Sequence, residues 1–153
     1  MFTGQSAQTL DEKNRLVIPA RFRRELEGKE RGVYLAVKST AEGNCLTVHS
    51  PSGWEAEAKR VADLAKERED AERFMWKFGW DTEPVQLDGQ WRLVVPQRLI
   101  EAAGLGREVM VAGVVTSIQV WDLARWKEVD ARLKAQLPAL SKSLYGPPRE
   151  GGA

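Results

Sequence analysis

The chain has 153 residues, of which 42% are apolar and 29% charged, a balance that excludes a disordered protein and allows one ordinary core or two small ones. The formal net charge of +1 gives no overall sign of a nucleic-acid partner, and a single cysteine, Cys45, excludes an internal disulfide. No stretch approaches the ~18 apolar residues that span a bilayer, and residues 1–10 lack a secretory signal pattern, so we expect a cytosolic protein without a membrane partner.

A stretch near the start of the chain recurs in its second half. Residues 11–23 read DEKNRLVIPARFR and residues 88–100 read DGQWRLVVPQRLI, an offset of 77 (88 minus 11). Asp, Arg, Leu, Val, Pro and a second Arg coincide at positions 11/88, 15/92, 16/93, 17/94, 19/96 and 21/98. These coincidences in one register indicate an internal duplication.

Each copy predicts a strand, a tight turn, a second strand and a helix. The β-branched runs at 16–18 and 93–95 favour strands. Pro19 and Pro96 are each expected to end a strand and open a helix, because proline fits the first helical turn and the residue before it avoids the helical region. The polar segments before the runs are expected to be turns that follow short strands.

Each predicted turn starts with an aspartate and has an arginine four residues later. Asp11 with Arg15, and Asp88 with Arg92, could form an ion pair that braces the turn. For the aspartates we favour this structural role, because the pair recurs where the flanking basic residues are fewer. For the arginines both roles stay open, bracing of the turn and contact with a phosphate or a guanine edge.

Basic residues gather in the first copy. Seven lysines and arginines stand against five acids in residues 11–31, whereas residues 88–108 carry three of each. Lys13 adjoins the first turn arginine, and three more arginines follow in the predicted helix. These helix arginines fit a solvated face or the positioning of a phosphate, and both interpretations stay open.

Beyond the predicted helices the two halves match with small slips. Residues 33–37 align with 109–113 at an offset of 76, and residues 46–48 align with 118–120 at an offset of 72. The change of four predicts a longer loop in the first half, at residues 38–44, where insertions are tolerated.

A helical insert is expected between the copies. Ser50 and Pro51 predict a helix start, and apolar residues at helical spacing continue to residue 65. A further helix is expected over 71–78, with Gly79 as its stop. Residues 74–80 hold five large apolar side chains, too many for one helix facing water, so part of this cluster is expected to be buried in the core or against another subunit.

After the second copy, Asp122 is a good N-cap for a helix that we expect to end near Leu137. From Pro138 the chain is rich in proline and glycine, which predicts a mobile tail.

The duplicated D-x-x-x-R-L-x-x-P unit, each copy followed by two more strands and a Trp-bearing helix, resembles the MraZ family of bacterial transcriptional regulators, as does the start MFTGQSAQTLDEKNRL. The resemblance runs from residue 1 to about residue 137. It implies an α+β fold of two SpoVT/AbrB-like swapped-hairpin repeats that form a pseudo-twofold β-barrel with flanking helices. The expected parts are repeat 1 at 5–50, the helical insert at 51–80, repeat 2 at 82–125, a C-terminal helix at 126–137 and a flexible tail at 138–153.

The resemblance also implies a sequence-specific regulator, expected to be a repressor, that binds repeated boxes on double-stranded DNA upstream of the cell-division and cell-wall gene cluster. It implies a ring-shaped homo-oligomer, an octamer or a dodecamer, and a cytoplasmic, nucleoid-associated protein. The residues expected to contact DNA are Lys13, Asn14, Arg15, Arg21, Arg23, Arg24 and Arg92. The residues of the structural motif are Asp11, Pro19, Asp88 and Pro96.

The chain departs from the family pattern beside each motif arginine. The family usually places glycine immediately before it, where this chain has Asn14 and Trp91. Asparagine tolerates a left-handed backbone, so the first turn is expected to be preserved. Tryptophan would be strained there, so the second turn is expected to differ in shape.

No catalytic residues are predicted, because the chain has no glycine-rich phosphate loop followed by a lysine, no nucleophile elbow and no suitably spaced histidine base. We therefore expect no enzyme, no cofactor and no small-molecule substrate. Cys45 and His49 are only two ligands, so no metal site is expected. Two other classes stay open: a ring-forming protein-interaction scaffold without specific DNA binding, supported by the aromatic cluster and the near-zero net charge, and, less favoured, an antitoxin-like regulator of the same fold.

Overall fold

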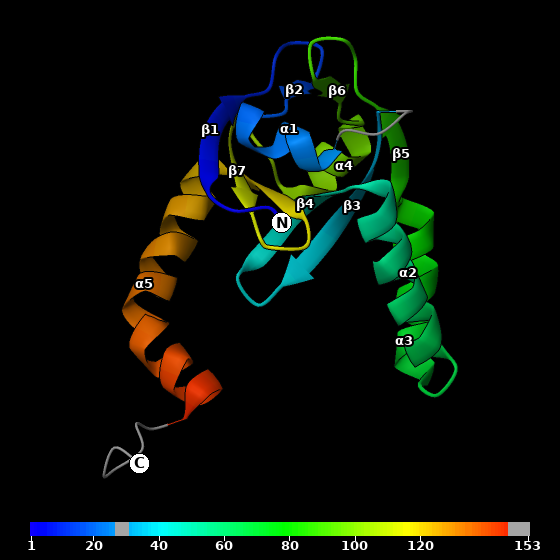
Figure 1. The fold of residues 1–153 in the computed structure, drawn as a ribbon, viewed down its shortest axis with the longest axis vertical. Coiled ribbons are helices and arrows are strands. Elements are labelled where there is room, and N and C mark those ends of the chain that lie inside the picture. The colour runs from blue at the N-terminus through cyan, green and yellow to red at the C-terminus, as the bar shows by residue number, and fades with distance from the viewer. Residues whose placement is uncertain (27–30, 147–153) are drawn as a thin grey trace. The chain divides into compact units, whose positions relative to one another are not determined.

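The computed structural model describes residues 1–26 and 31–146, which fall into one compact unit from Met1 to Leu123 and a second from Ala124 onward. Figure 1 shows the elements in chain order. They are β1 (Gln5–Thr9), β2 (Arg15–Val17), α1 (Ala20–Leu26), β3 (Gly32–Thr40), β4 (Gly43–His49), α2 (Pro51–Ala65), α3 (Glu69–Asp81), β5 (Glu83–Gln86), β6 (Arg92–Val94), α4 (Gln97–Ala103), β7 (Glu108–Gly113), β8 (Ile118–Asp122) and α5 (Leu123–Tyr145).

The elements predicted from the duplicated segment are present in both copies. In each copy a short strand, β1 or β5, precedes the polar turn, and a three-residue strand, β2 or β6, follows it. Pro19 and Pro96 then stand between that strand and a seven-residue helix, α1 or α4. The order strand, turn, strand, helix is therefore confirmed.

The strands form a six-stranded antiparallel sheet, in the order β1-β7-β8-β4-β3-β5, and a separate two-stranded ribbon, β2-β6. The first strand of each half pairs with the third strand of the other half, β1 with β7 and β5 with β3. Leu16 pairs with Leu93 in the ribbon, and Thr47 pairs with Gln119 in the sheet. Both pairs join positions that align between the two halves, at offsets of 77 and 72, so the pairing is reciprocal.

The α+β class is confirmed, but the strands do not close into the predicted pseudo-twofold β-barrel. β1 and β5 lie at opposite edges of the six-stranded sheet. The ribbon strands pair with each other and, among the described residues, with no strand of the larger sheet. The continuous circuit of strand pairing that a barrel requires is therefore not completed. Pro84 in the edge strand β5 also has no backbone N–H to offer a further strand.

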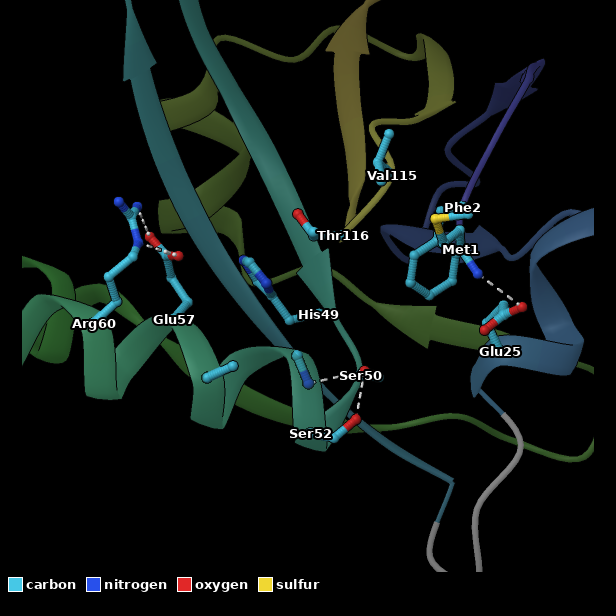
Figure 2. Close-up of a pocket in the computed structure, with 12 residues that line it drawn as sticks. Met1, Phe2, Glu25, His49, Ser50, Ser52, Glu57, Arg60, Val115 and Thr116 are labelled. Carbon is cyan, nitrogen blue, oxygen red and sulfur yellow. Dashed lines mark hydrogen bonds and ion pairs between the residues drawn. The ribbon is translucent and has the colours of Figure 1, made fainter.

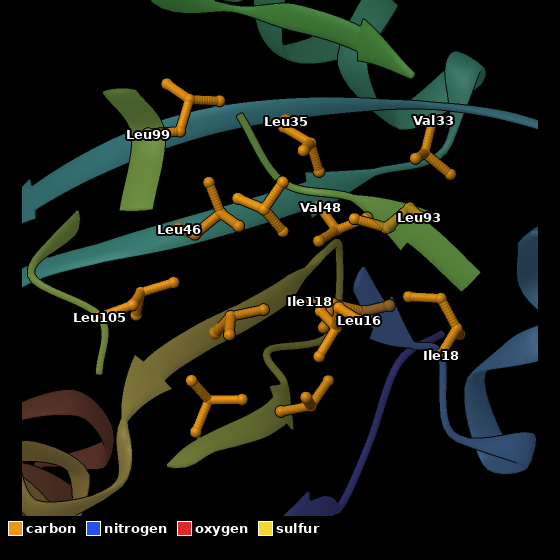
Figure 3. Close-up of a cluster of buried hydrophobic side chains, with 14 of the residues drawn as sticks. Leu16, Ile18, Val33, Leu35, Leu46, Val48, Leu93, Leu99, Leu105 and Ile118 are labelled. Atoms are coloured by element: carbon orange, nitrogen blue, oxygen red, sulfur yellow. The ribbon is translucent and has the colours of Figure 1, made fainter. Parts of the chain in front are cut away.

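The core lies between one face of the six-stranded sheet and the ribbon (Figure 3). Leu16 and Leu93 of the ribbon are 0% and 1% exposed, and Leu35, Leu46 and Ile118 face them from the sheet. Because side chains alternate along a strand, burial of the two ribbon leucines directs their neighbours on β2 and β6 outward. The core therefore fixes which ribbon residues reach the surface.

The extra four residues of the first half lengthen β3 and β4 rather than the loop between them. Thr40 pairs with Gly43 across a two-residue connection. The Thr40 hydroxyl donates to the carbonyl of Gly43 at 2.8 Å and accepts from the backbone N–H of Glu42 at 3.1 Å, which closes the hairpin. The loop predicted over 38–44 is therefore wrong.

The insert folds as two helices. The Ser50 hydroxyl accepts from the backbone N–H of Gly53 at 3.1 Å and caps α2, as predicted. The Trp54 ring stacks on Tyr34 of β3 at 4.5 Å and on Phe78 of α3 at 6.1 Å, so aromatic packing joins both helices to the sheet. α3 runs through Gly79, contrary to the predicted stop, because one interior glycine weakens a helix by only about 1 kcal/mol.

α3 has no buried residue. Trp76 is 47% exposed and Trp80 is 71% exposed, so these members of the aromatic cluster do not lie in the core of the chain.

In the second unit, α5 continues through Pro138 to Tyr145, so the predicted helix end at Leu137 is wrong. Proline removes one helical hydrogen bond, but alanine and leucine residues on both sides favour the helix. Residues 147–153 of the predicted tail lie outside the described residues. Among the described helices, none combines the length and apolar character needed to cross a membrane.

Candidate nucleic-acid interface

The first turn is built around the carboxylate of Asp11. Its Oδ1 accepts from the backbone N–H groups of Lys13 at 2.9 Å and Arg15 at 2.8 Å. Its Oδ2 accepts from Nε of Arg15 at 2.5 Å. The pKa of Asp11 is lowered, chiefly by the backbone N–H of Arg15, so the carboxylate is charged at neutral pH. The aspartate therefore organises the turn.

The second turn repeats this geometry. The Asp88 carboxylate accepts from the backbone N–H groups of Gln90 at 2.8 Å and Arg92 at 2.9 Å, and from Nε of Arg92 at 2.8 Å. The pKa of Asp88 is lowered, mainly by the backbone N–H of Arg92. The bracing predicted for both aspartates is present.

Trp91 does not change the shape of its turn, so the expected difference between the two turns is wrong. Trp91 and Asn14 both have a φ of 59°, in the left-handed region. The guanidinium of Arg31 lies 4.8 Å from the centre of the Trp91 ring, and that of Arg23 lies 5.8 Å from it. Cation–π contacts of this kind contribute about 0.5–2 kcal/mol each, which offsets the backbone strain of a non-glycine residue.

Each turn arginine meets its aspartate through Nε only. Neither Arg15 nor Arg92 makes a hydrogen bond through Nη1 or Nη2 to any residue in the described part of the chain. Their side chains are 31% and 29% exposed. A guanidinium held in this way keeps two parallel N–H groups available for a bidentate contact with a phosphate or with O6 and N7 of guanine.

The outward face of the ribbon alternates arginine and valine. Arg15 pairs with Val94, and Val17 pairs with Arg92, so the two arginines lie diagonally across the ribbon. Val94 is 54% exposed, although its β-branched side chain is apolar. Sequence reasoning did not select Val94, because the valine run gives no sign of which member faces outward.

Backbone hydrogen bonds also join each turn to the other half of the chain. The backbone N–H of Ile18 donates to the carbonyl of Trp91 at 2.8 Å, and that of Val95 donates to the carbonyl of Asn14 at 2.9 Å. Each half therefore completes the other half's turn, and the paired strands β2 and β6 that carry Arg15 and Arg92 lie side by side (Figure 1).

Arg31 and Arg107 reinforce this exchange and were not predicted. Arg107 donates from Nη1 to the carbonyl of Asp11, and Arg31 donates from Nη1 to the carbonyl of Asp88 at 3.3 Å. The two arginines align at the offset of 76 found for the third strands. Extending the repeat comparison to this pair would have revealed them.

The other predicted contact residues fall into two groups. Lys13 is exposed in the first turn, and the Asn14 amide donates to Oε1 of Gln97 at 3.1 Å. In α1, Arg21 donates to the carbonyl of Gln5 at 3.1 Å, and half-buried Arg23 donates through Nε to the carbonyl of Ile18 at 2.9 Å. Arg24 is exposed. The structure thus groups Lys13, Asn14, Arg15 and Arg92 on the two turns and the ribbon, and it gives Arg23 a structural partner.

A cavity of about 650 Å³ lies beside the start of α2 (Figure 2). Its charged groups pair with one another: the α-amino group of Met1 lies 3.0 Å from Glu25, and Arg60 lies 2.9 Å from Glu57. His49 also lines it, and burial lowers the pKa of the imidazole. None of the residues predicted to contact DNA lines this cavity.

Cys45 is buried, and burial raises the pKa of its thiol to about 11. His49 bonds through Nε2 to the hydroxyl of Thr47 at 3.1 Å. Among the described residues no three His, Cys, Asp or Glu side chains gather where they could hold a metal ion.

Fold and site define a class: an α+β protein in which two turns, each with an aspartate paired to an arginine, adjoin a short β-ribbon. More specifically, the chain belongs to the MraZ family, whose sequence model, described as "MraZ protein, putative antitoxin-like", matches residues 1–75 and 80–143. The resemblance noted in the sequence is thereby confirmed.

Relatives named transcriptional regulator MraZ match nearly the whole chain. The protein from Moorella thermoacetica is 36% identical, over 94% of this chain and 96% of the relative. The one from Pseudomonas savastanoi pv. phaseolicola is 37% identical, over 93% and 91%. The one from Syntrophomonas wolfei is 31% identical, over 94% and 96%.

Proposed function

We propose that this chain is a DNA-binding transcriptional regulator whose two turns and β2-β6 ribbon contact the duplex. The observation that carries the proposal is that Arg15 and Arg92 are each held by their aspartate through Nε, while their Nη groups make no hydrogen bond to the described residues. A purely structural ion pair would not require that both arginines keep a partly exposed guanidinium with two unused Nη groups. The name transcriptional regulator, given to the relatives, supports the same assignment.

The ribbon would read the major groove, which admits a two-stranded β-ribbon. Arg15 and Arg92 would each donate two N–H groups to guanine. Val94, exposed between them, would contact the methyl group of a thymine. Lys13 and Arg24, both exposed and cationic, would contact phosphates and set the position of the ribbon on the duplex.

The regulator would repress the cell-division and cell-wall gene cluster. It would bind repeated DNA boxes as a ring-shaped homo-oligomer, and it would be a cytoplasmic, nucleoid-associated protein. One subunit offers a small basic surface, so binding to one box should be weak. In a ring, adjacent subunits would engage adjacent boxes, which raises the overall affinity by roughly 10²–10⁴ when the spacing fits. Specificity would then reside partly in the spacing of the boxes.

The swapped-hairpin arrangement of two repeats is part of the same proposal. Its support is the reciprocal pairing of β1 with β7 and of β5 with β3, together with the exchanged bonds between the turns. Such an arrangement would present two equivalent arginines from one chain. We propose no catalytic role and no cofactor.

A mobility-shift titration of the purified protein on its own upstream DNA, repeated over a salt series, tests this function. If each subunit neutralises two to three phosphates and several subunits bind, the logarithm of the association constant should fall with that of the salt concentration by about 0.9 per phosphate. A scrambled duplex of equal length is the control. A slope near one would reject phosphate contacts by several subunits, and equal binding to the scrambled duplex would reject sequence-specific DNA binding.

The second candidate is a protein-interaction scaffold, which the exposed Trp76 and Trp80 favour. In that case the oligomer should form without DNA, and the titration should show no preference for the upstream sequence. The same experiment therefore separates the two functions.

A further inference from the structure

The two turns differ at their tips. Glu12 and Lys13 occupy the tip of the first turn, whereas Gly89 and Gln90 occupy the tip of the second. The backbone N–H of Lys13 donates to the aspartate of its turn at 2.9 Å, and that of Gln90 donates to its own at 2.8 Å, so the two residues hold the same place. Both are exposed. A charged tip in one half of the chain therefore corresponds to a neutral amide in the other.

In the described part of the chain, the side-chain amide of Gln90 has no hydrogen-bond partner. By contrast, the Asn14 amide donates to Oε1 of Gln97 at 3.1 Å, and Gln97 donates in turn to Glu101 at 3.2 Å. Gly89, next to Gln90, has no side chain, and no atom beyond its chain neighbours lies within 4 Å of the place that a Cβ would take. Gln90 thus presents a donor and an acceptor together at an open tip.

An amide of this kind matches one base edge of the duplex. In the major groove adenine presents the N7 acceptor beside the N6 amino donor, so a glutamine amide can donate to N7 and accept from N6 at once. Guanine presents N7 and O6, two acceptors, and the amide oxygen would then face another acceptor. Lysine has three donors and no acceptor, so Lys13 cannot accept from N6. A preference for adenine therefore belongs to the second turn alone.

We propose that Gln90 determines specificity by reading an adenine near the guanine that Arg92 contacts. The inference rests on the proposed function, because it needs the second turn to lie in the major groove. Two residues span at most about 7 Å and base pairs follow one another at about 3.4 Å, so the adenine lies within about two base pairs of that guanine. Arg15 and Arg92 repeat one contact, whereas Lys13 and Gln90 make the two halves recognise different bases.

Single atomic changes in the DNA test this contact. A labelled duplex with one upstream box is titrated by fluorescence anisotropy, and each adenine of the box is replaced in turn by 7-deazaadenine, which keeps its base pair but lacks the N7 acceptor. One adenine should prove sensitive, with wild-type binding weakened by about 5-fold or more. Gln90→Ala should bind the natural duplex more weakly by a similar factor and should not respond to the replacement. Gln5→Ala, which removes another exposed glutamine, is the matched control and should behave as the wild type.

Two exchanges test the chemistry of the amide rather than the presence of a side chain. Gln90→Glu replaces the donor by a second acceptor, so it should prefer cytosine at the sensitive position, because glutamate accepts from the N4 amino group. Lys13→Gln gives the first turn the same amide, so it should gain about 5-fold or more when an adenine is added near the guanine that Arg15 contacts, whereas the wild type should not. Neither native side chain makes a hydrogen bond to the described residues, so both variants should fold like the wild type, as circular dichroism can check.

The outcomes separate this contact from DNA binding as such. If the wild type prefers its box to a scrambled duplex but Gln90→Ala keeps the response to 7-deazaadenine, or if no adenine proves sensitive, the inference falls and the proposed function stands. Equal weakening of Gln90→Ala on the box and on the scrambled duplex would assign Gln90 a phosphate contact and would also overturn the inference. If the wild type itself has no preference for the box, both fall.

Discussion

Replacing Arg15 with alanine separates the two roles that its side chain combines. The Asp11 carboxylate would lose its bond to Nε but keep both backbone N–H donors, from Lys13 and from residue 15 itself. The backbone N–H of residue 15 is also the largest cause of the lowered pKa of Asp11, so the carboxylate should stay charged. The turn should therefore persist, with a thermal midpoint within about 4 °C of the wild type.

DNA binding should respond much more strongly. Loss of one bidentate guanine contact costs about 1–3 kcal/mol, which corresponds to roughly 5- to 150-fold weaker binding. Because a ring would repeat the contact at every box, the measurement should use a labelled duplex with a single box and read fluorescence anisotropy. Arg15→Lys keeps the charge but not the fork, so it should lose specificity with an unchanged salt slope.

Arg24→Ala is the matched control, since it removes one exposed arginine outside the turns. It should weaken binding to specific and scrambled duplexes equally. The reasoning would be refuted if Arg15→Ala unfolded, if it lost its oligomeric state, or if it bound the specific duplex within about twofold of the wild type. Either of the first two results would assign Arg15 a purely structural role.

Three further predictions concern the ribbon and the second turn. Replacing a box thymine by deoxyuridine should weaken wild-type binding in the anisotropy assay but leave Val94→Ala unaffected, and an equal loss in both would exclude the methyl contact. Leu93→Ala should lower the free energy of unfolding in urea by about 2–5 kcal/mol, because the side chain is 1% exposed, and a change below about 1 kcal/mol would contradict its place in the core. The pKa of Asp88 is lowered in the folded state from its usual 3.8, so its stabilisation is complete above about pH 4 and is lost as the pH falls through the lowered value. The wild type should therefore melt above Asp88→Asn at neutral pH and lose that advantage in acid, whereas a constant difference down to about pH 2 would refute the linkage.

The sequence predicts those features that depend only on residues close together along the chain. Pro19 and Pro96 mark the change from strand to helix through their own backbone restrictions, and Ser50 marks the start of α2. The aspartate at the start of each turn accepts its hydrogen bonds from residues no more than four positions later in the chain. These elements formed where the residues predicted them.

The errors arose where distant contacts decide the outcome. Trp91 adopts a left-handed backbone because arginines from elsewhere pack on its ring, which no local rule reveals. The open sheet follows from which distant strands pair, and a strand pattern alone does not give this. Pro138 was read as a helix end although the flanking residues favour a helix strongly enough to continue.

The bonds exchanged between the two turns have a consequence for dividing the chain. The carbonyls of Asp11 and Asn14 take donors from Arg107 and Val95, so the leading half lacks parts of its own turn when it is alone. Cutting the polypeptide in the connection between α2 and α3 would leave both halves incomplete. Two separately expressed fragments should therefore form ordered turns only when they reassociate. This dependence would suit the fold to use as a split reporter.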